Sequence, residues 1–279
     1  MNIIKKEIIY PSCSHTFNII PLGDIHLGNI GCDIKKLTKI ITWIKETPRT
    51  FWIGTGDYTE CINIDDPRFD ELSVDPDYRL RGISRLITQQ MRDIVALLRP
   101  IQNKCIGLVS GNHEETIRLR YKRDIMYEIA ERLHLQHLLL GYDGWIRLQF
   151  IRKPSTTIKL RNTSHTSYTI YISHGFGAAR KSGAKVNRLE DFTTFMDADI
   201  IILGHEHKKI IAPPVIKLYL TQEGNLSYRK QIALMAGSFL RGYVENATTY
   251  IEKKGYPPSD LGVVKIMLKP AVHDIHASI

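Results

Sequence analysis

Five short groups of aspartate, asparagine and histidine residues carry side chains that could hold metal ions. They are Asp24-Ile25-His26, Gly56-Asp57, Gly111-Asn112-His113-Glu114, Ser173-His174-Gly175 and Gly204-His205-Glu206-His207. Carboxylate oxygens and neutral imidazoles suit borderline divalent metals. Two such ions about 3.5–4 Å apart can clamp the attacking and leaving oxygens of a phosphoryl displacement. Each group alone is a weak signal, but together they supply the ligands for two ions.

A strand-like apolar run stands directly before each of these groups. The runs cover residues 17–22, 51–53, 105–109, 168–172 and 199–203. Their length and their β-branched residues indicate buried strands. Sites in open α/β sheets form at the carboxyl ends of the strands. We therefore expect the polar groups to meet at one edge of a folded sheet.

Helical periodicity fills the intervals between the runs. Apolar stripes within residues 34–44, 83–98, 125–133 and 189–195 predict helices that pack on the core. Residues 215–220 and 226–235 indicate two strands around a turn, and 263–268 a last strand closed off by Pro270. This alternation predicts a layered sheet with extra antiparallel strands toward the C-terminus. With no linker evident, we expect a single domain over 1–279, with a motif-bearing core of about 16–240 and a C-terminal strand extension of about 241–279.

Composition narrows the classes of protein that need to be considered. The chain is 43% hydrophobic and 24% charged, which is typical of a globular protein and not of a disordered one. No apolar stretch approaches the roughly 20 residues of a membrane span. The first residues carry no secretory signal and the four cysteines form no C-x-x-C pair, so we expect a cytoplasmic, intracellular protein with reduced thiols. The net charge of +9 favours anionic partners such as phosphates and nucleic acids.

The polar groups, in this order, resemble the ligand set of the calcineurin-like metallophosphoesterase superfamily over about two-thirds of the chain. The resemblance implies an α/β fold in which a layered β-sandwich is flanked by helices, in the order α/β/β/α. It also implies two divalent metal ions, with Mn²⁺ expected first and Fe or Zn as alternatives. The metal ligands that it implies are Asp24, His26 and His207 for the first ion, Asn112, His174 and His205 for the second, and Asp57 as a bridge between them.

The resemblance further implies a reaction, the hydrolysis of a phosphoester by a metal-bridged hydroxide that attacks phosphorus in line. His113, the histidine after the asparagine ligand, would protonate the leaving oxygen or stabilise the transition state. Such a histidine usually needs an orienting carboxylate. Glu60 is the first candidate, because Ser/Thr protein phosphatases of the superfamily carry an aspartate at this spacing from the bridging ligand. Glu114 is the second candidate.

One departure from those protein phosphatases bears on the substrate. They continue with an Asp-Arg-Gly whose arginine holds the phosphate, whereas this chain reads Glu60-Cys61-Ile62. The missing arginine disfavours a phosphoprotein substrate. It leaves the metal ligands unaffected.

Basic residues near the site groups are candidates for substrate contacts. The candidates are Arg118, Arg120 and Tyr121 after the His113 group, Arg180 and Lys181 after His174, and Arg241 beyond the last ligand. Such residues could track a phosphate backbone and stack on a base, although a solvated helix face has the same pattern. We therefore predict a phosphodiesterase or nuclease acting on DNA or RNA. The alternatives are a phosphatase or phosphodiesterase acting on a small nucleotide, and a non-catalytic scaffold, which the complete ligand set and His113 disfavour.

Overall fold

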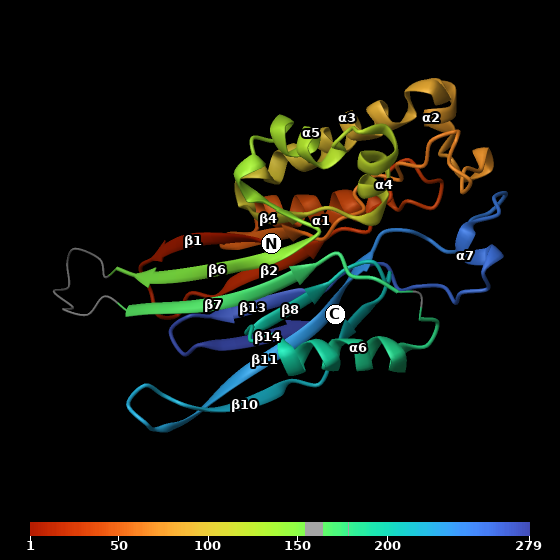
Figure 1. Cartoon of the computed structure of the whole chain (residues 1–279). Helices are drawn as coiled ribbons and strands as arrows, with labels where there is room; N and C mark the ends of the chain where they lie inside the picture. The colour runs from red at the N-terminus through yellow and green to blue at the C-terminus, as the bar shows by residue number, and fades with distance from the viewer. Residues whose placement is uncertain (154–163, 178) are drawn as a thin grey trace.

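The chain folds into two β-sheets that stack face to face, with helices on their outer sides (Figure 1). The structure is a computed structural model that describes residues 1–153, 164–177 and 179–279. One sheet has the strand order β14-β13-β2-β3-β4-β5, and the other has the order β1-β6-β7-β8-β11-β10, with β9 and β12 also paired to β11. The expected α/β fold, a layered β-sandwich flanked by helices, is thereby confirmed.

The six-stranded sheet is parallel at its centre. Its strands are β2 (Phe17–Leu22), β3 (Thr50–Gly54), β4 (Cys105–Val109), β5 (Leu139–Gly141), β13 (Lys265–Lys269) and β14 (Asp274–Ser278). Strands β2 to β5 are parallel, so their carboxyl ends share one edge of the sheet, while β13 and β14 are antiparallel additions beside β2. The helices on its outer side are α1 (Ile34–Glu46), α2 (Pro76–Leu80), α3 (Leu86–Leu98), α4 (Asn112–Tyr121) and α5 (Ile125–Arg132).

The eight-stranded sheet combines parallel strands with a long hairpin. Its strands are β1 (Asn2–Tyr10), β6 (Asp143–Arg152), β7 (Ser164–Ser173), β8 (Ile200–Leu203), β9 (Lys209–Ile211), β10 (Val215–Leu220), β11 (Leu226–Ser238) and β12 (Gly262–Val263). Strands β7, β8 and β11 run parallel, and β10 and β11 form the antiparallel hairpin that the sequence predicts. Helix α6 (Ser182–Phe195) packs on the outer face, and the short α7 (Tyr250–Lys253) lies beyond the strand ends (Figure 1).

Apolar side chains between the two sheets form the main core. Phe17 from one sheet packs on Phe150 from the other with ring centres 4.7 Å apart, and Ile170 and Ile202 are fully buried in the same cluster. A second cluster lies under α6, where Leu189 packs with Ile201. Both clusters leave the strand ends free to carry polar residues, which is where the five groups stand.

The structure confirms the strands predicted before the polar groups and the four predicted helices. It also contains β1, β5, β6 and β14, which the sequence patterns did not predict. Strand β1 alternates exposed and buried residues, and β6 does so over most of its length, so neither contains a long apolar run. The prediction that 263–268 is the last strand is wrong. Pro270 lies in a turn, and β14 follows it and pairs with β13. Among the described residues, no helix has the length and hydrophobicity that crossing a bilayer requires.

Candidate metal centre

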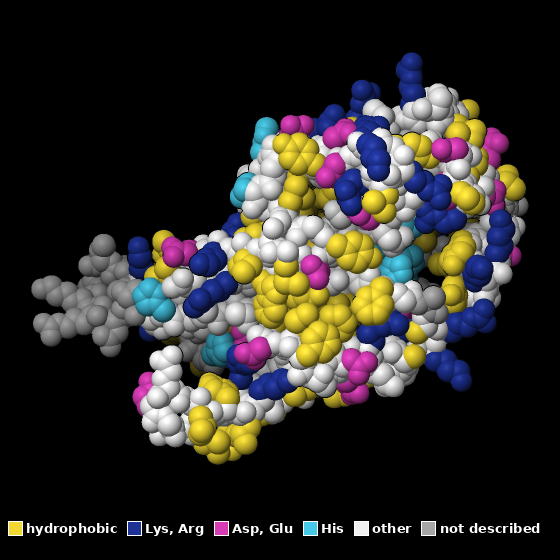
Figure 2. Space-filling model, in the orientation of Figure 1, with side chains coloured by type: hydrophobic (Ala, Val, Ile, Leu, Met, Phe, Trp, Pro, Cys, Tyr) yellow, Lys and Arg dark blue, Asp and Glu magenta, His cyan; other side chains and the backbone are white. Residues whose placement is uncertain are grey.

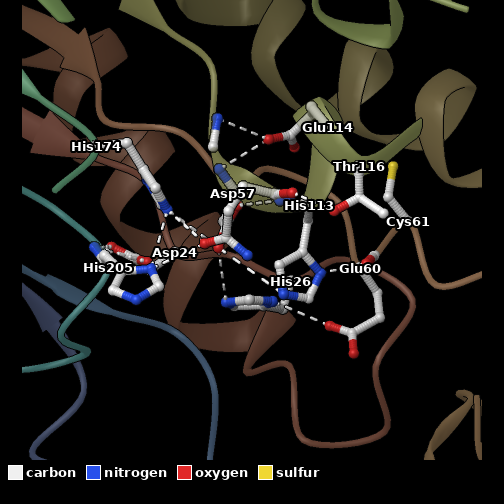
Figure 3. Close-up of polar contacts among 12 residues, drawn as sticks. Asp24, His26, Asp57, Glu60, Cys61, His113, Glu114, Thr116, His174 and His205 are labelled. Atoms are coloured by element: carbon white, nitrogen blue, oxygen red, sulfur yellow. Dashed lines mark hydrogen bonds and ion pairs between the residues drawn. The ribbon is translucent and has the colours of Figure 1, made fainter. Parts of the chain in front are cut away.

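The parallel strands of both sheets bring the predicted donor residues to a common edge. Strands β2, β3 and β4 lead to Asp24 and His26, to Asp57 and to Asn112, and strands β7 and β8 lead to His174, His205 and His207. In Figure 3 the side chains of Asp24, His26, Asp57, His174 and His205 point toward one another across this edge. Donors that lie far apart in the sequence therefore meet because their strands end together.

The first cluster of donors consists of Asp24, His26 and His207, whose ligand atoms all lie within 4.8 Å of one another. The Nε2 atoms of His26 and His207 are 3.1 Å apart, and His207 Nε2 lies 3.5 Å from Asp24 Oδ1. Two imidazole nitrogens that face each other beside a carboxylate suit a divalent cation, which can accept both lone pairs at once.

The second cluster consists of Asn112, His174 and His205. The Asn112 Oδ1 atom lies 2.8 Å from His205 Nδ1 and 3.0 Å from His174 Nε2. The other ring nitrogens face backbone oxygens, since His174 Nδ1 is 2.8 Å from Thr55 O and His205 Nε2 is 2.9 Å from Gly177 O. Such outer contacts fix the rings, so that the nitrogens facing the cluster are the ones available to a metal.

Asp57 lies between the two clusters. Its Oδ2 atom is 3.7 Å from His26 Nε2 and 3.4 Å from His174 Nε2, so one carboxylate oxygen faces both donor sets. Its Oδ1 atom accepts a hydrogen bond of 3.0 Å from the backbone N–H of His113, which holds the carboxylate in place. This is the position that a ligand shared by two ions would occupy.

The pKa values of two buried donors, Asp24 and His174, indicate that positive charge is favoured beside them. Burial raises the pKa of the Asp24 carboxyl to about 7. Burial acts to lower the pKa of His174, but the charge and hydrogen bond of Asp57 outweigh it and raise that pKa to about 10. Protons thus collect on these groups, and divalent cations bound among the same atoms would replace them. The donor set therefore fits the metals that the resemblance implies.

Five of the seven donor residues have a backbone in the left-handed region. Their φ angles are 46° at Asp24, 52° at His26, 50° at Asp57, 70° at His205 and 51° at His207. This conformation costs roughly 1–2 kcal/mol for a residue with a side chain, and such residues cluster at functional sites. The strained turns are held by hydrogen bonds between loops, such as Asp24 N–H to Gly56 O at 2.9 Å.

Two glycines in the motifs allow the loops to approach each other. A Cβ atom on Gly56, which has φ of 90°, would lie 2.6 Å from His174 Nδ1. A Cβ atom on Gly111 would lie 2.0 Å from Asp57 Oδ1. Only glycine fits at these two positions, which gives the Gly-Asp and Gly-Asn pairs of the sequence a steric reason.

Glu114 ties the loop after β3 to the loop after β4 (Figure 3). Its buried carboxylate accepts four backbone N–H groups, from Gly111 at 3.0 Å, Asp57 at 3.0 Å, Tyr58 at 2.8 Å and Thr59 at 3.2 Å. It also caps the first turn of α4. The Glu114 carboxylate therefore positions the bridging Asp57 and makes no hydrogen bond to the His113 ring.

Glu60 contacts His26 through its carboxylate and His113 through its backbone oxygen. Its carboxylate lies 3.0 Å from His26 Nδ1 and accepts from Asn29 Nδ2 at 3.1 Å, and its backbone oxygen accepts from His113 Nδ1. The expected orienting contact to His113 is thus made by the peptide oxygen, while the carboxylate orients His26. The His113 Nε2 atom lies 4.0 Å from Asp57 Oδ2, so it faces the donor clusters.

A pocket of about 310 Å³ opens onto both clusters and His113. Four cationic residues contribute to its lining, namely Arg68, Arg180, Lys185 and Lys208. Figure 2 shows Lys and Arg side chains gathered near a histidine in a hollow of the surface. The pocket thus combines metal donors with positive charge, which suits a phosphate-bearing substrate.

Of the six residues that the sequence predicts to contact substrate, one lies at the pocket. Arg180 lines the pocket, and the other five do not. Arg118 pairs with Glu115, Arg120 faces Asp66, Tyr121 donates to Asp65, Arg241 pairs with Asp33, and Lys181 is exposed at the start of α6. Sequence reasoning missed Arg68, Lys185 and Lys208. Lys208 follows His207 directly and could have been noticed, whereas Arg68 and Lys185 reach the pocket only through the fold.

Two stacked sheets with carboxylate, amide and imidazole donors at one edge define the class of metal-dependent phosphoester hydrolases. Residues 17–209 match the family model described as calcineurin-like phosphoesterase. Because the match covers more than half of the sequence, the chain belongs to the calcineurin-like phosphoesterase family, and it is a metal-dependent phosphoester hydrolase.

Two solved structures are similar to the chain at low identity. One, from Streptococcus pneumoniae, is described as a conserved uncharacterized protein and predicted phosphoesterase; it has 11% identity and a TM-score of 0.33, with 95% of this chain and 97% of that chain covered. The other is a metallophosphoesterase from Sphaerobacter thermophilus with 12% identity and a TM-score of 0.39, with 94% and 89% covered. The search of curated proteins gave no match.

Proposed function

We propose that this hydrolase is a dinuclear metal enzyme that cleaves phosphodiester bonds of nucleic acid. The observation that carries the dinuclear site is the position of Asp57, whose Oδ2 atom faces His26 on one side and His174 on the other. The proposed ligands are Asp24, His26 and His207 for one ion, Asn112, His174 and His205 for the other, and Asp57 for both. Bound divalent ions, with Mn²⁺ proposed first and Fe or Zn as alternatives, would activate water for in-line attack and offset phosphoryl charge.

His113 is the proposed acid for the leaving oxygen. Its Nδ1 atom donates to the backbone oxygen of Glu60, so its Nε2 atom is the one directed at the clusters. That nitrogen is the one placed to pass a proton to the leaving oxygen as the P–O bond breaks. The peptide oxygen of Glu60 thereby fixes both the ring orientation and the reacting nitrogen.

The distribution of charge supports a polynucleotide substrate. Arg68 and Lys185 line the pocket but pair with Asp66 and Glu206. Arg180, before α6, and Lys208, after β8, form no ion pair among the described residues, so they are the cations available to a substrate. Phosphates on either side of the reacting one would find partners there. The net charge of +9 would also draw a polyanion to the surface.

The second candidate is hydrolysis of a small nucleotide or another small phosphoester. The pocket volume of about 310 Å³ favours it, because that value lies at the lower end of pockets that enclose small ligands. A non-catalytic scaffold is disfavoured, because the chain belongs to a phosphoesterase family and carries all seven candidate metal ligands and His113.

A substrate panel with the manganese-loaded enzyme separates the two candidates. The panel comprises aryl monoesters and diesters, cyclic nucleotides, single-stranded and double-stranded DNA, and RNA. We expect cleavage of at least one polynucleotide at a rate well above that of the aryl esters. Action on small esters alone would remove the nuclease proposal and leave the small-substrate candidate.

The role of His113 is tested by the His113→Ala variant. We expect kcat to fall by a factor on the order of 10²–10⁴, because the leaving oxygen loses its proton donor, while the metal content stays near that of the wild type. The exposed His276 on β14 supplies a control, and His276→Ala should keep wild-type turnover. His26, Glu60 and His113 also present ligand atoms within 4.8 Å, so loss of metal from the variant would make His113 a ligand instead.

A further inference from the structure

The pocket extends from the donor clusters to a wall that metal chemistry does not need. This wall is formed by residues of α7 and the segment after it, and Tyr250, Ile251, Tyr256 and Pro257 belong to the pocket lining. Aromatic and apolar side chains there lie in the same cavity as His113 and Asp57. A bare phosphate ester has no group that such a wall would recognise.

In this wall the Arg180 guanidinium lies over the Tyr256 ring, and both groups are held by hydrogen bonds. The guanidinium carbon of Arg180 lies 5.4 Å from the centre of the Tyr256 ring, and Arg180 Nη2 donates to Lys254 O at 3.0 Å. The backbone of Tyr256 is fixed at both ends, since its N–H donates to Ile251 O at 3.0 Å and its oxygen accepts from Tyr243 Oη at 2.9 Å. These contacts position the pair before any ligand arrives, which reduces the entropic cost of binding.

Stacked tyrosine and arginine planes are the surfaces on which proteins bind nucleobases, because every base has a π-face and the guanidinium adds a cation–π contribution. We propose that Tyr256, together with Arg180, stacks the base of the nucleotide whose phosphate lies at the donor clusters. This inference rests on the proposed function for the position of the phosphate. The substrate class that follows is a nucleotide unit of any base, because stacking does not depend on base identity.

The site makes a quantitative prediction about ligands with and without a base. A stacked base should raise affinity by a factor on the order of ten relative to the same sugar phosphate without its base. The comparison uses adenosine 5′-monophosphate and ribose 5-phosphate, titrated calorimetrically into the manganese-loaded His113→Ala protein, in which turnover is slow. We expect the first ligand to bind about tenfold more tightly than the second.

Variants at the wall then identify the residues responsible. Tyr256→Ala should bring the affinity ratio close to one, whereas Tyr256→Phe keeps the ring and should keep the ratio. Arg180 is exposed, so Arg180→Gln should fold normally and should lower the ratio even where Tyr256→Ala is unstable. Tyr228→Ala removes an exposed tyrosine from the β10–β11 hairpin and should leave the ratio unchanged. Equal binding of the two ligands to the parent protein, or a ratio unaffected by both Tyr256→Ala and Arg180→Gln, would overturn the proposal.

Failure of the base site and failure of the proposed function give different results. Cleavage of polynucleotides by an enzyme whose affinity ratio is one would overturn the stacking site and leave the phosphodiesterase proposal intact. A tenfold ratio in an enzyme that cleaves no polynucleotide would remove the nuclease proposal and support a base site for small nucleotides.

Discussion

The Glu60 carboxylate contacts the ring nitrogen of His26 that does not face the first donor cluster. This contact fixes the ring and raises the basicity of the opposite nitrogen, as carboxylates behind metal-binding histidines do. The geometry gives Glu60 a larger role in metal affinity than the sequence suggested. Its effect on His113 passes through the peptide oxygen, which a side-chain substitution does not remove.

We predict that Glu60→Gln weakens manganese affinity by roughly 10–100-fold, because the amide cannot provide the charge of the carboxylate behind His26. At saturating metal, turnover should fall less than in His113→Ala. Titration of the metal-free protein with manganese, followed by kcat at saturation, measures both effects. Unchanged affinity together with a large loss of kcat would contradict the contact to His26 and favour a direct role toward His113.

A second residue-scale prediction concerns stability. Glu114→Gln should lower the free energy of unfolding of the metal-free protein by about 2–3 kcal/mol, because a neutral amide cannot accept the four N–H groups that converge on the carboxylate. Urea unfolding measures the change. The matched control is Glu115→Gln on the same helix, where the side chain is partly exposed and, among the residues that the structure describes, forms an ion pair with Arg118 alone. That control should change stability by less than about 0.5 kcal/mol.

The sequence predicts the candidate donors but little of what holds them in place. Asp57 and Asn112 are recognisable because each belongs to a short motif after an apolar run. The left-handed backbone at Asp24 and His205 and the contacts of Glu114 are set by loops that meet only in the folded chain. No local pattern encodes such long-range contacts, so the orienting role of each glutamate had to come from the structure.

At the scale of elements, α6 is tied to the loop that carries two of the donors. Lys185 donates to the backbone oxygen of Glu206 at 2.8 Å and forms an ion pair with its carboxylate. Arg188 pairs with the same carboxylate and donates to Phe176 O at 2.7 Å. Since Glu206 stands between His205 and His207, this buried network sets the position of both histidines.

We predict that Lys185→Met lowers the free energy of unfolding by about 3–5 kcal/mol, because it leaves the buried Glu206 carboxylate with fewer partners. Metal affinity should fall with it, since the loop between His205 and His207 loses its anchor. Chemical denaturation and manganese titration provide the two measurements. Lys181→Ala, at the exposed start of the same helix, is the control. A Lys185→Met protein with wild-type stability and metal affinity would show that α6 does not position the loop.

Elements with one apolar face or a fully apolar run could be predicted, and the remaining ones could not. Helix α3 and strand β8 show clear patterns, whereas most of β1 and β6 alternates buried and exposed residues and gives no such run. The basic run from Arg118 was interpreted as a substrate surface because charge alone does not reveal its partners. Its pairing with Glu115 three residues earlier follows helix spacing and is the one part that the sequence could have shown.

At the scale of the whole molecule, the two sheets contribute unequal halves of one site. Asp24, Asp57 and Asn112 follow strands of the six-stranded sheet, and His174 and His205 follow strands of the eight-stranded sheet. Metal bound among them would join the sheets at their common edge. The single-domain organisation over 1–279 stays a prediction; strands β13 and β14, at the end of the chain, extend the same sheet as β2.

The number of metal ions per chain tests the shared position of Asp57 most directly. Protein loaded with manganese and freed of unbound metal is assayed for metal and protein together, for the wild type and for Asp57→Asn. The geometry predicts two ions per chain in the wild type and fewer than one in the variant, because the variant lacks the carboxylate that faces both clusters. A single ion in the wild type, or two ions retained by a folded Asp57→Asn variant, would contradict a dinuclear centre built around Asp57.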